Sequence, residues 1–130
     1  MTNPDRRKQA RLISRTTNTS NTVQALDGRT GELIWEHRIG PESTRAYGAT
    51  RSLAIYNDKI FVPTTDAKLY ALNARNGKIV WQADVGPAGR GYTNSAGPLV
   101  VNGKVIQSLT GCSQYKDEGC YISAWDAETG

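Results

Sequence analysis

The sequence predicts an all-β chain assembled from a repeated unit, and three observations support that prediction. The pattern Ala-x-(Asp/Asn)-x-x-(Thr/Asn)-Gly-x-x-x-Trp occurs at residues 25–35 and 71–81, and a third copy starts at Ala124. The segments between the copies resemble one another, and none has the 3.6-residue apolar period of an amphipathic helix. Self-similarity at a fixed period is typical of a modular architecture.

Each copy of the pattern predicts a tight turn between two short strands. In the first copy, the carboxylate of Asp27 can accept a hydrogen bond from the backbone N–H two residues on, which forms an Asx-turn. Gly31 can adopt the left-handed conformation that ends such a turn. The flanking runs TVQAL and ELIW have a β-like composition. The pattern therefore predicts a β-hairpin.

The segments between the copies predict a second hairpin in each unit. Residues 51–64 (RSLAIYNDKIFVPT) align with residues 97–109 (GPLVVNGKVIQSL), and both have the pattern strand, turn, strand. Asn102-Gly103 favours a type I′ turn because both residues tolerate a positive φ, and Asn57-Asp58 occupies the equivalent place.

Four short strands in each period are typical of one blade of a β-propeller, with a β-sandwich of accidentally similar segments as the alternative. The period is 46 residues, the distance from Trp35 to Trp81. The repeat units lie near 23–68, 69–121 and 122–130, and the last stops four residues before its Trp. Propellers close with about four to eight blades. We therefore expect residues 23–130 to form an incomplete propeller, a fragment of a larger protein.

The positive charge of the chain is concentrated near its N-terminus. The formal net charge is +4, whereas residues 23–130 carry eleven basic and eleven acidic residues. We expect residues 1–22 to be a basic leader, poorly ordered or the end of a preceding blade. A neutral propeller body predicts no nucleic-acid partner. No apolar run approaches the roughly 18 residues that span a bilayer, so no membrane span is expected.

The repeat and the segments between its copies resemble the eight-bladed quinoprotein alcohol dehydrogenases, which use pyrroloquinoline quinone (PQQ). ALDGRTGELIW and ALNARNGKIVW match the repeat of that family, in which the Trp packs between neighbouring blades. The run from Arg51 to Trp81 resembles the family's second blade, and YTNSAGPLVVNGKVIQSLTG resembles the opening of its third blade. The resemblance covers about residues 23 to 130.

The resemblance implies four PQQ-binding residues. Arg51 stands where the family has an Arg that pairs with a PQQ carboxylate, and a guanidinium suits that partner because it binds carboxylates bidentately. Ser95 stands where the family has a Thr that hydrogen-bonds the quinone acid. Thr110 and Gly111 match the Ser-Gly pair that lies against the cofactor. The resemblance places the family's catalytic Asp in later blades, so no catalytic residue is expected here.

The sequence departs from the family pattern in the segments around these residues. The two adjacent cysteines that many members carry just before the Arg are replaced by STRAYGATR. Ser113 stands where many members have a calcium-binding Glu, so no metal ligand is expected from this segment. The resemblance still implies calcium or a lanthanide in the full-length protein. A cysteine-bearing loop replaces the family's Gly-rich loop.

The two cysteines of the chain allow three interpretations. Zinc needs about four ligands, and the chain offers only one histidine besides Cys112 and Cys120. Two free thiols are compatible with a cytoplasmic protein. A disulfide that closes the inserted loop fits best, and it indicates an oxidising compartment such as the periplasm. The only histidine, His37, is expected to be structural.

The resulting functional hypothesis is a PQQ-dependent alcohol dehydrogenase, of which this chain is a fragment that is not expected to be active alone. Its substrate would be an alcohol, polyol or sugar, and electrons would pass to a cytochrome c or similar acceptor. The alternative is a non-catalytic PQQ-like propeller that serves as a protein-binding scaffold of the cell envelope. A third possibility is a short protein that assembles blades from several chains.

Overall fold

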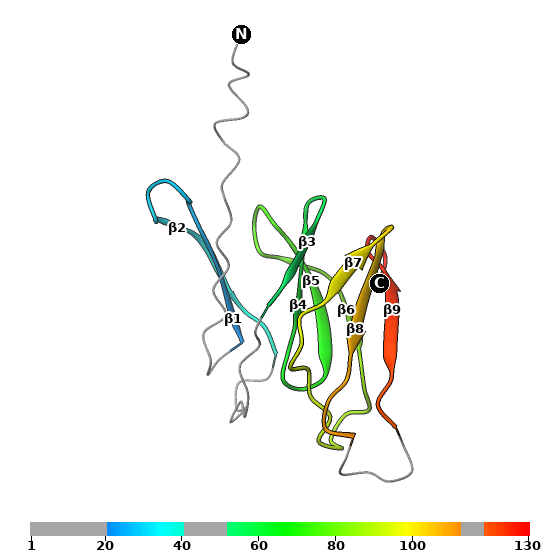
Figure 1. Ribbon diagram of the computed structural model, residues 1–130. Helices are drawn as coiled ribbons and strands as arrows, with labels where there is room; N and C mark the ends of the chain where they lie inside the picture. The colour runs from blue at the N-terminus through cyan, green and yellow to red at the C-terminus, as the bar shows by residue number, and fades with distance from the viewer. Residues whose placement is uncertain (1–20, 41–51, 113–118) are drawn as a thin grey trace.

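The computed structural model describes residues 21–40, 52–112 and 119–130 and shows antiparallel β-sheets (Figure 1). The strands are β1 (Thr22–Leu26), β2 (Leu33–Arg38), β3 (Ala54–Tyr56), β4 (Lys59–Pro63), β5 (Lys68–Asn73), β6 (Ile79–Asp84), β7 (Leu99–Val101), β8 (Lys104–Ser108) and β9 (Ile122–Asp126). The predicted all-β class is confirmed.

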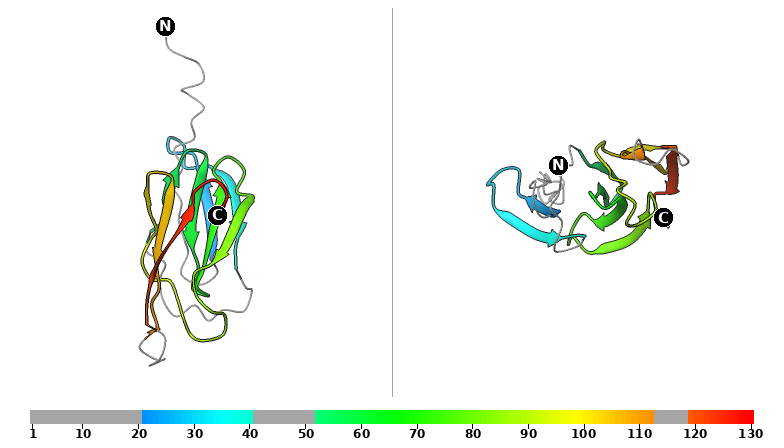
Figure 2. Two further views of the ribbon diagram at one scale, coloured as in Figure 1. Left: turned by 90° about the vertical axis from the view of Figure 1, so that its right-hand side faces the viewer. Right: turned by 90° about the horizontal axis from the view of Figure 1, so that it is seen from below.

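The strands form three sheets in chain order, β1-β2, β3-β4-β5-β6 and β7-β8-β9. Every pairing is between consecutive strands and antiparallel, so each sheet is a meander. Seen from below, the sheets follow one another side by side (Figure 2). The central sheet is a complete four-stranded blade, and the other two sheets are parts of blades.

The sheets are out of phase with the sequence repeat. The repeat unit that starts near residue 69 begins in β5, the third strand of the central sheet. Each unit therefore supplies the last two strands of one blade and the first two strands of the next.

Two apolar cores lie between successive sheets, and strands β4 and β5 contribute to both. Phe61, Leu69 and Ala71 belong to the core shared with the third sheet. Ile60 and Leu72 belong to the core shared with the first sheet. Every residue of β4 is buried. Since successive side chains of a strand point to opposite faces, a strand covered on both faces reads as a continuous apolar run.

The repeat turns have the predicted Asx geometry. Asp27 Oδ1 accepts hydrogen bonds from the backbone N–H groups of Arg29 (2.7 Å) and Thr30 (3.1 Å). The N–H of Gly31, whose φ is 74°, donates to the carbonyl of Asp27 at 2.8 Å. The turns that begin at Asn73 and Asp126 repeat this arrangement.

The repeat tryptophans join each sheet to the next. Trp35 Nε1 donates a hydrogen bond to the carbonyl of Ala74 (3.0 Å), and Trp81 Nε1 donates to that of Ala127 (3.1 Å). Both carbonyls belong to the repeat turn of the following sheet. The predicted packing of the Trp between neighbouring blades is confirmed.

The other hairpins are two-residue turns that differ in backbone geometry. Asn102 and Gly103 have φ of 47° and 70°, as the predicted type I′ turn requires. In the equivalent turn only Asn57, of the two turn residues, has a positive φ (53°). A glycine at the second position accounts for the difference, because glycine adopts positive φ at no steric cost.

Candidate functional site

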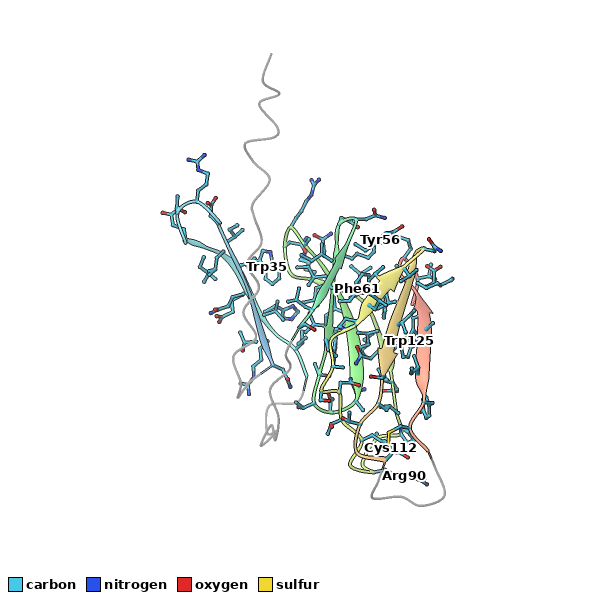
Figure 3. The ribbon with its side chains drawn as sticks, in the orientation of Figure 1. Trp35, Tyr56, Phe61, Arg90, Cys112 and Trp125 are labelled. Carbon is cyan, nitrogen blue, oxygen red and sulfur yellow. A yellow bond between two sulfur atoms is a disulfide. The ribbon has the colours of Figure 1, made fainter. Side chains whose placement is uncertain are left out.

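Three of the residues singled out by the resemblance, Ser95, Thr110 and Gly111, lie in connections at one end of the sheets, opposite the repeat turns. Strand direction alternates, so the β4–β5, β6–β7 and β8–β9 connections share the end drawn lowest in Figure 1, here called the lower end. Ser95 lies in the β6–β7 connection, whereas Thr110 and Gly111 follow β8. Figure 3 shows Cys112 and Arg90 at the same end. Arg51 and Ser113 lie outside the described residues.

Thr110 is joined to Thr93 by a four-part contact between the β6–β7 and β8–β9 connections. The backbones form an isolated antiparallel bridge, with Thr93 N to Thr110 O at 3.0 Å and Thr110 N to Thr93 O at 2.9 Å. Thr110 Oγ1 donates to Thr93 O at 2.9 Å and lies 2.8 Å from Thr93 Oγ1. Because the hydroxyl of Thr110 carries one proton, that proton is already used inside the protein. Thr110 therefore retains only acceptor capacity toward a ligand.

Gly111 is required by the packing of the chain itself. Its φ is 89°, and a Cβ at this position would lie 2.5 Å from the carbonyl oxygen of Gly91. A side chain at residue 111 would therefore collide with the backbone of the β6–β7 connection. The contact of Gly111 with a cofactor, which the resemblance implies, stays a prediction beside this internal contact.

Asn94 ties the β6–β7 connection to the central sheet. The side chain is 2 % exposed, and its Nδ2 donates to the carbonyls of Thr64 (3.1 Å) and Lys68 (2.9 Å) in the β4–β5 turn. Its Oδ1 is buried and has no hydrogen-bond partner in the part of the chain that the structure describes. Nothing in the sequence marked Asn94, because one sequence does not distinguish a buried amide from an exposed one.

Gln107 holds the same connection from the other side. The side chain is 1 % exposed, and its Nε2 donates to the carbonyls of Ala96 (2.9 Å) and Ser108 (3.1 Å). Its Oε1 is also buried, and no described residue forms a hydrogen bond with it. A signal for Gln107 existed, because it shares strand parity with the apolar Val105 and Leu109 and so falls on the buried face.

Ser95 is exposed and lies between these fixed neighbours. Two residues later, Gly97 packs against Ser52, whose Oγ would lie 1.5 Å from a Cβ at residue 97. Ser52 is the first described residue after Arg51 and precedes β3. The starts of β3 and β7, the first strands of two successive sheets, therefore meet at the lower end beside Ser95.

The two cysteines form the predicted disulfide. Cys112 is bonded to Cys120, with Cα atoms 5.2 Å apart. The bridge closes the β8–β9 connection immediately after Gly111. The connection is an insertion, because the spacing from Asn73 to Asp126 is 53 residues whereas that from Asp27 to Asn73 is 46. Residues 113–118 of this loop lie outside the described residues.

The ionisable groups with perturbed pKa values lie mainly at the opposite, upper end. Hydrogen bonds from the backbone N–H of Glu128, from the Lys104 side chain and from the backbone N–H of Thr129 lower the pKa of Asp126 to about 2. Glu128 and Asp58 raise the pKa of the nearly buried Lys59 by hydrogen bonding to its ammonium, at 2.5 Å and 2.9 Å. These contacts stabilise the turns at the upper end. None of them involves a candidate site residue.

His37 also belongs to the contact between sheets. Its Nδ1 donates to the carbonyl of Gly77 at 2.5 Å, which joins β2 to the repeat turn of the central sheet. This agrees with the structural role expected from the sequence. Among the described residues, no group of three or more His, Cys, Asp or Glu side chains could hold a metal ion. No helix in the described ranges is long and apolar enough to cross a membrane.

The lower end fits a cofactor with carboxylate and quinone oxygens in part. Such a cofactor needs hydrogen-bond donors, and the exposed hydroxyl of Ser95 can supply one. The hydroxyl proton of Thr110 is already used, and the space beside Gly111 is filled by Gly91. Among the described candidates, Ser95 is thus the one whose hydroxyl is available as a donor to such a cofactor.

Comparison with known proteins assigns the family. The family model PQQ_2, described as outer membrane protein assembly factor BamB, matches residues 7–130. The chain belongs to this family. The match begins inside the segment expected to be a leader, so family similarity extends beyond the repeats recognised in the sequence.

Similar proteins include both alcohol dehydrogenases and BamB. The quinohemoprotein alcohol dehydrogenase ADH-IIG of Pseudomonas putida is 36% identical over 121 residues, which are 88% of this chain and 17% of that protein. Its solved structure superposes with a TM-score of 0.76 at 33% identity, over 92% of this chain and 18% of that one. A europium-containing methanol dehydrogenase superposes with a TM-score of 0.74 at 27% identity, over 92% of this chain and 21% of that one. The structure of BamB from Moraxella catarrhalis superposes with a TM-score of 0.63 at 25% identity, over 92% of this chain and 30% of that one.

These similarities confirm the predicted resemblance to PQQ-type propeller dehydrogenases and the predicted propeller architecture. The chain spans 17% of the length of the ADH-IIG dehydrogenase, so that match concerns one part of a longer protein.

Proposed function

We propose that the protein containing this chain is a PQQ-dependent dehydrogenase that oxidises an alcohol, polyol or sugar. The observation that carries the proposal is the similarity to ADH-IIG, whose 121 aligned residues extend well beyond the repeat turns. PQQ would supply the chemistry by accepting a hydride from the alcohol, and the protein would bind and orient the reactants. Electrons would then pass to a cytochrome c or similar acceptor.

The residues proposed to hold PQQ are those singled out in the sequence. Arg51 would pair with a carboxylate of the cofactor. The hydroxyl of Ser95 would donate a hydrogen bond to it, whereas that of Thr110 would accept one or contribute shape, because its proton is donated to Thr93. Gly111 would shape the site through its backbone. Calcium or a lanthanide would bind with ligands that come mainly from other parts of the protein.

A periplasmic location is part of the proposal. The Cys112–Cys120 disulfide supports it, because structural disulfides persist in oxidising compartments and are rare in the cytosol.

The test is reconstitution of the full-length protein with PQQ together with calcium or a lanthanide. Dye-linked oxidation of a panel of alcohols, and retention of PQQ after gel filtration, would support the proposal. A protein that neither retains PQQ nor turns over any alcohol would contradict it. Reduction of cytochrome c in place of the dye checks the proposed acceptor.

The second candidate function is a non-catalytic scaffold of the cell envelope. It is favoured by the description of the matching family model and by the superposition on BamB. Both the TM-score and the identity are higher for ADH-IIG than for BamB, which is why the dehydrogenase ranks first. A full-length protein that binds no PQQ but captures envelope proteins would reverse this order.

A further inference from the structure

The segment Thr93–Gly97 at the lower end is fixed at nearly every residue except Ser95. Thr93 is bridged to Thr110 through backbone and side chain. The side chain of Asn94 is inserted toward the β4–β5 turn, and the carbonyl of Ala96 accepts from Gln107. Gly97 lies against Ser52. The side chain of Ser95 remains exposed.

Asn94 and Gln107 connect the segment to two different sheets. Asn94 ties it to the carbonyls of Thr64 and Lys68 in the preceding sheet. Gln107 ties it to β8 of its own sheet. The backbone around Ser95 is therefore held across the junction of two blades rather than by either blade alone.

The energetics of these two amides indicate a role other than stability. Each donates both of its N–H groups to backbone carbonyls, and its oxygen is buried with no hydrogen-bond partner among the described residues. A buried polar atom without a hydrogen bond is costly, and an apolar side chain of similar shape costs little in its place where the carbonyls it leaves keep other donors. Unpaired buried polar atoms of this kind are expected at functional sites, where a required geometry is kept although it lowers the stability of the fold.

We propose that Asn94 and Gln107 are positioning residues, which present the hydroxyl of Ser95 as a donor to a carboxylate or quinone oxygen of the bound cofactor. This inference rests on the proposed function. Neither amide needs to touch the ligand, because each acts through the backbone on one side of Ser95. Preorganisation of a donor strengthens binding by removing the cost of ordering it at the moment of association.

The substitution Asn94→Leu separates positioning from stability. The carbonyl of Thr64 also accepts from Ala67 N (3.2 Å), and that of Lys68 accepts from Thr64 N (2.9 Å). Removing the amide therefore leaves neither carbonyl without a donor and also removes the unpartnered oxygen. We expect the unfolding midpoint of the full-length protein to change little while the segment around Ser95 loosens. The matched control is Asn73→Asp, because the equivalent positions of the other repeats are Asp27 and Asp126.

Hydrogen exchange followed by mass spectrometry tests the positioning without any ligand. In Asn94→Leu, the amides of residues 93–97 should exchange at least about tenfold faster, which corresponds to loss of about one hydrogen bond. Those of β8 should be unchanged, and Asn73→Asp should leave both regions unchanged. Unaltered exchange at residues 93–97 in Asn94→Leu would overturn the proposal.

PQQ affinity tests whether the amide acts through Ser95. Asn94→Leu should weaken PQQ binding about tenfold in the wild-type background and by less than about twofold in a Ser95→Ala background, since coupled residues are not additive. Equal weakening in both backgrounds would show that Asn94 does not act through Ser95. If the wild-type protein binds no PQQ, the dehydrogenase proposal and the role of Ser95 fail together, whereas hydrogen exchange still decides whether Asn94 holds the segment.

Discussion

The contact between a repeat tryptophan and the next repeat turn can be measured by adding one methyl group to the turn. Gly31 and Gly77 occupy equivalent turns and have nearly equal φ, 74° and 71°. A Cβ at Gly31 would have no atom within 4 Å, whereas a Cβ at Gly77 would lie 2.5 Å from Trp35 Cε3. The substitutions Gly31→Ala and Gly77→Ala therefore share the backbone strain and differ in the collision with the indole.

The expected costs follow from these two contributions. Left-handed backbone costs an L-residue about 1–2 kcal/mol, which is the whole expected effect of Gly31→Ala. Overpacking adds about 1–3 kcal/mol at Gly77 because the indole cannot move freely while its Nε1 is bonded to Ala74. Gly77→Ala should thus lower the free energy of unfolding by about 2–5 kcal/mol. Gly130→Ala should fall between the two, since its Cβ would lie 3.2 Å from Trp81.

Guanidinium unfolding of the full-length protein, followed by far-ultraviolet circular dichroism, measures these differences. A double-mutant cycle isolates the contact: in a Trp35→Ala background, Gly77→Ala should cost no more than Gly31→Ala. Equal costs for Gly31→Ala and Gly77→Ala in the wild-type background would refute the docking of the tryptophan on the next turn.

Three further predictions concern the disulfide and the charged residues of the turns. Denatured, unreduced protein should contain no free thiol, and replacing both Cys112 and Cys120 by Ser should cost at most about 2.5 kcal/mol, the loop-entropy value for nine residues; two reactive thiols would contradict the bridge. Because the pKa of Asp126 is lowered from its ordinary value of 3.8 to about 2 in the folded protein, its contribution to stability is complete above about pH 5 and should be lost as the pH falls toward 2. Asp126→Asn should flatten that part of the curve of unfolding midpoint against pH, and an unchanged slope would show that Asp126 does not contribute to it. Lys59→Met should destabilise the protein more than Lys104→Met, since the side chain of Lys59 is 8% exposed and that of Lys104 is 56% exposed; thermal unfolding of the two variants checks the order, and the reverse order would contradict it.

The repeat architecture could be predicted from the sequence because its signals are local. An Asx-turn needs only the side chain of Asp27 and the backbone two or three residues on, and Asn102-Gly103 specifies its own turn. Such interactions close within a few residues, so spacing and residue type are enough to place them. The period then fixed the succession of hairpins and the place of each tryptophan.

The arrangement at the lower end could not be predicted in the same way. The resemblance singled out Ser95, Thr110 and Gly111 one by one, but it did not show that the proton of Thr110 is donated to Thr93. It also did not show that the glycine at 111 is required by Gly91. Both facts depend on contacts between separate connections, whose approach is set by the packing of whole sheets.

The sequence by itself determined the all-β class, the blade repeat and the inserted loop, because each follows from local turn chemistry or fixed spacing, and it favoured a disulfide between Cys112 and Cys120 without excluding free thiols. Only the tertiary structure decided which polar side chains are buried and which carbonyls they reach. Asn94 looks like an ordinary loop residue in the sequence, and the strand parity of Gln107 indicates its buried face but not the carbonyls that it reaches, yet both residues are almost completely buried where two sheets meet. A buried amide forms hydrogen bonds with the backbone groups that lie next to it in the neighbouring blade. Those groups come close to the amide only once the blades have packed together.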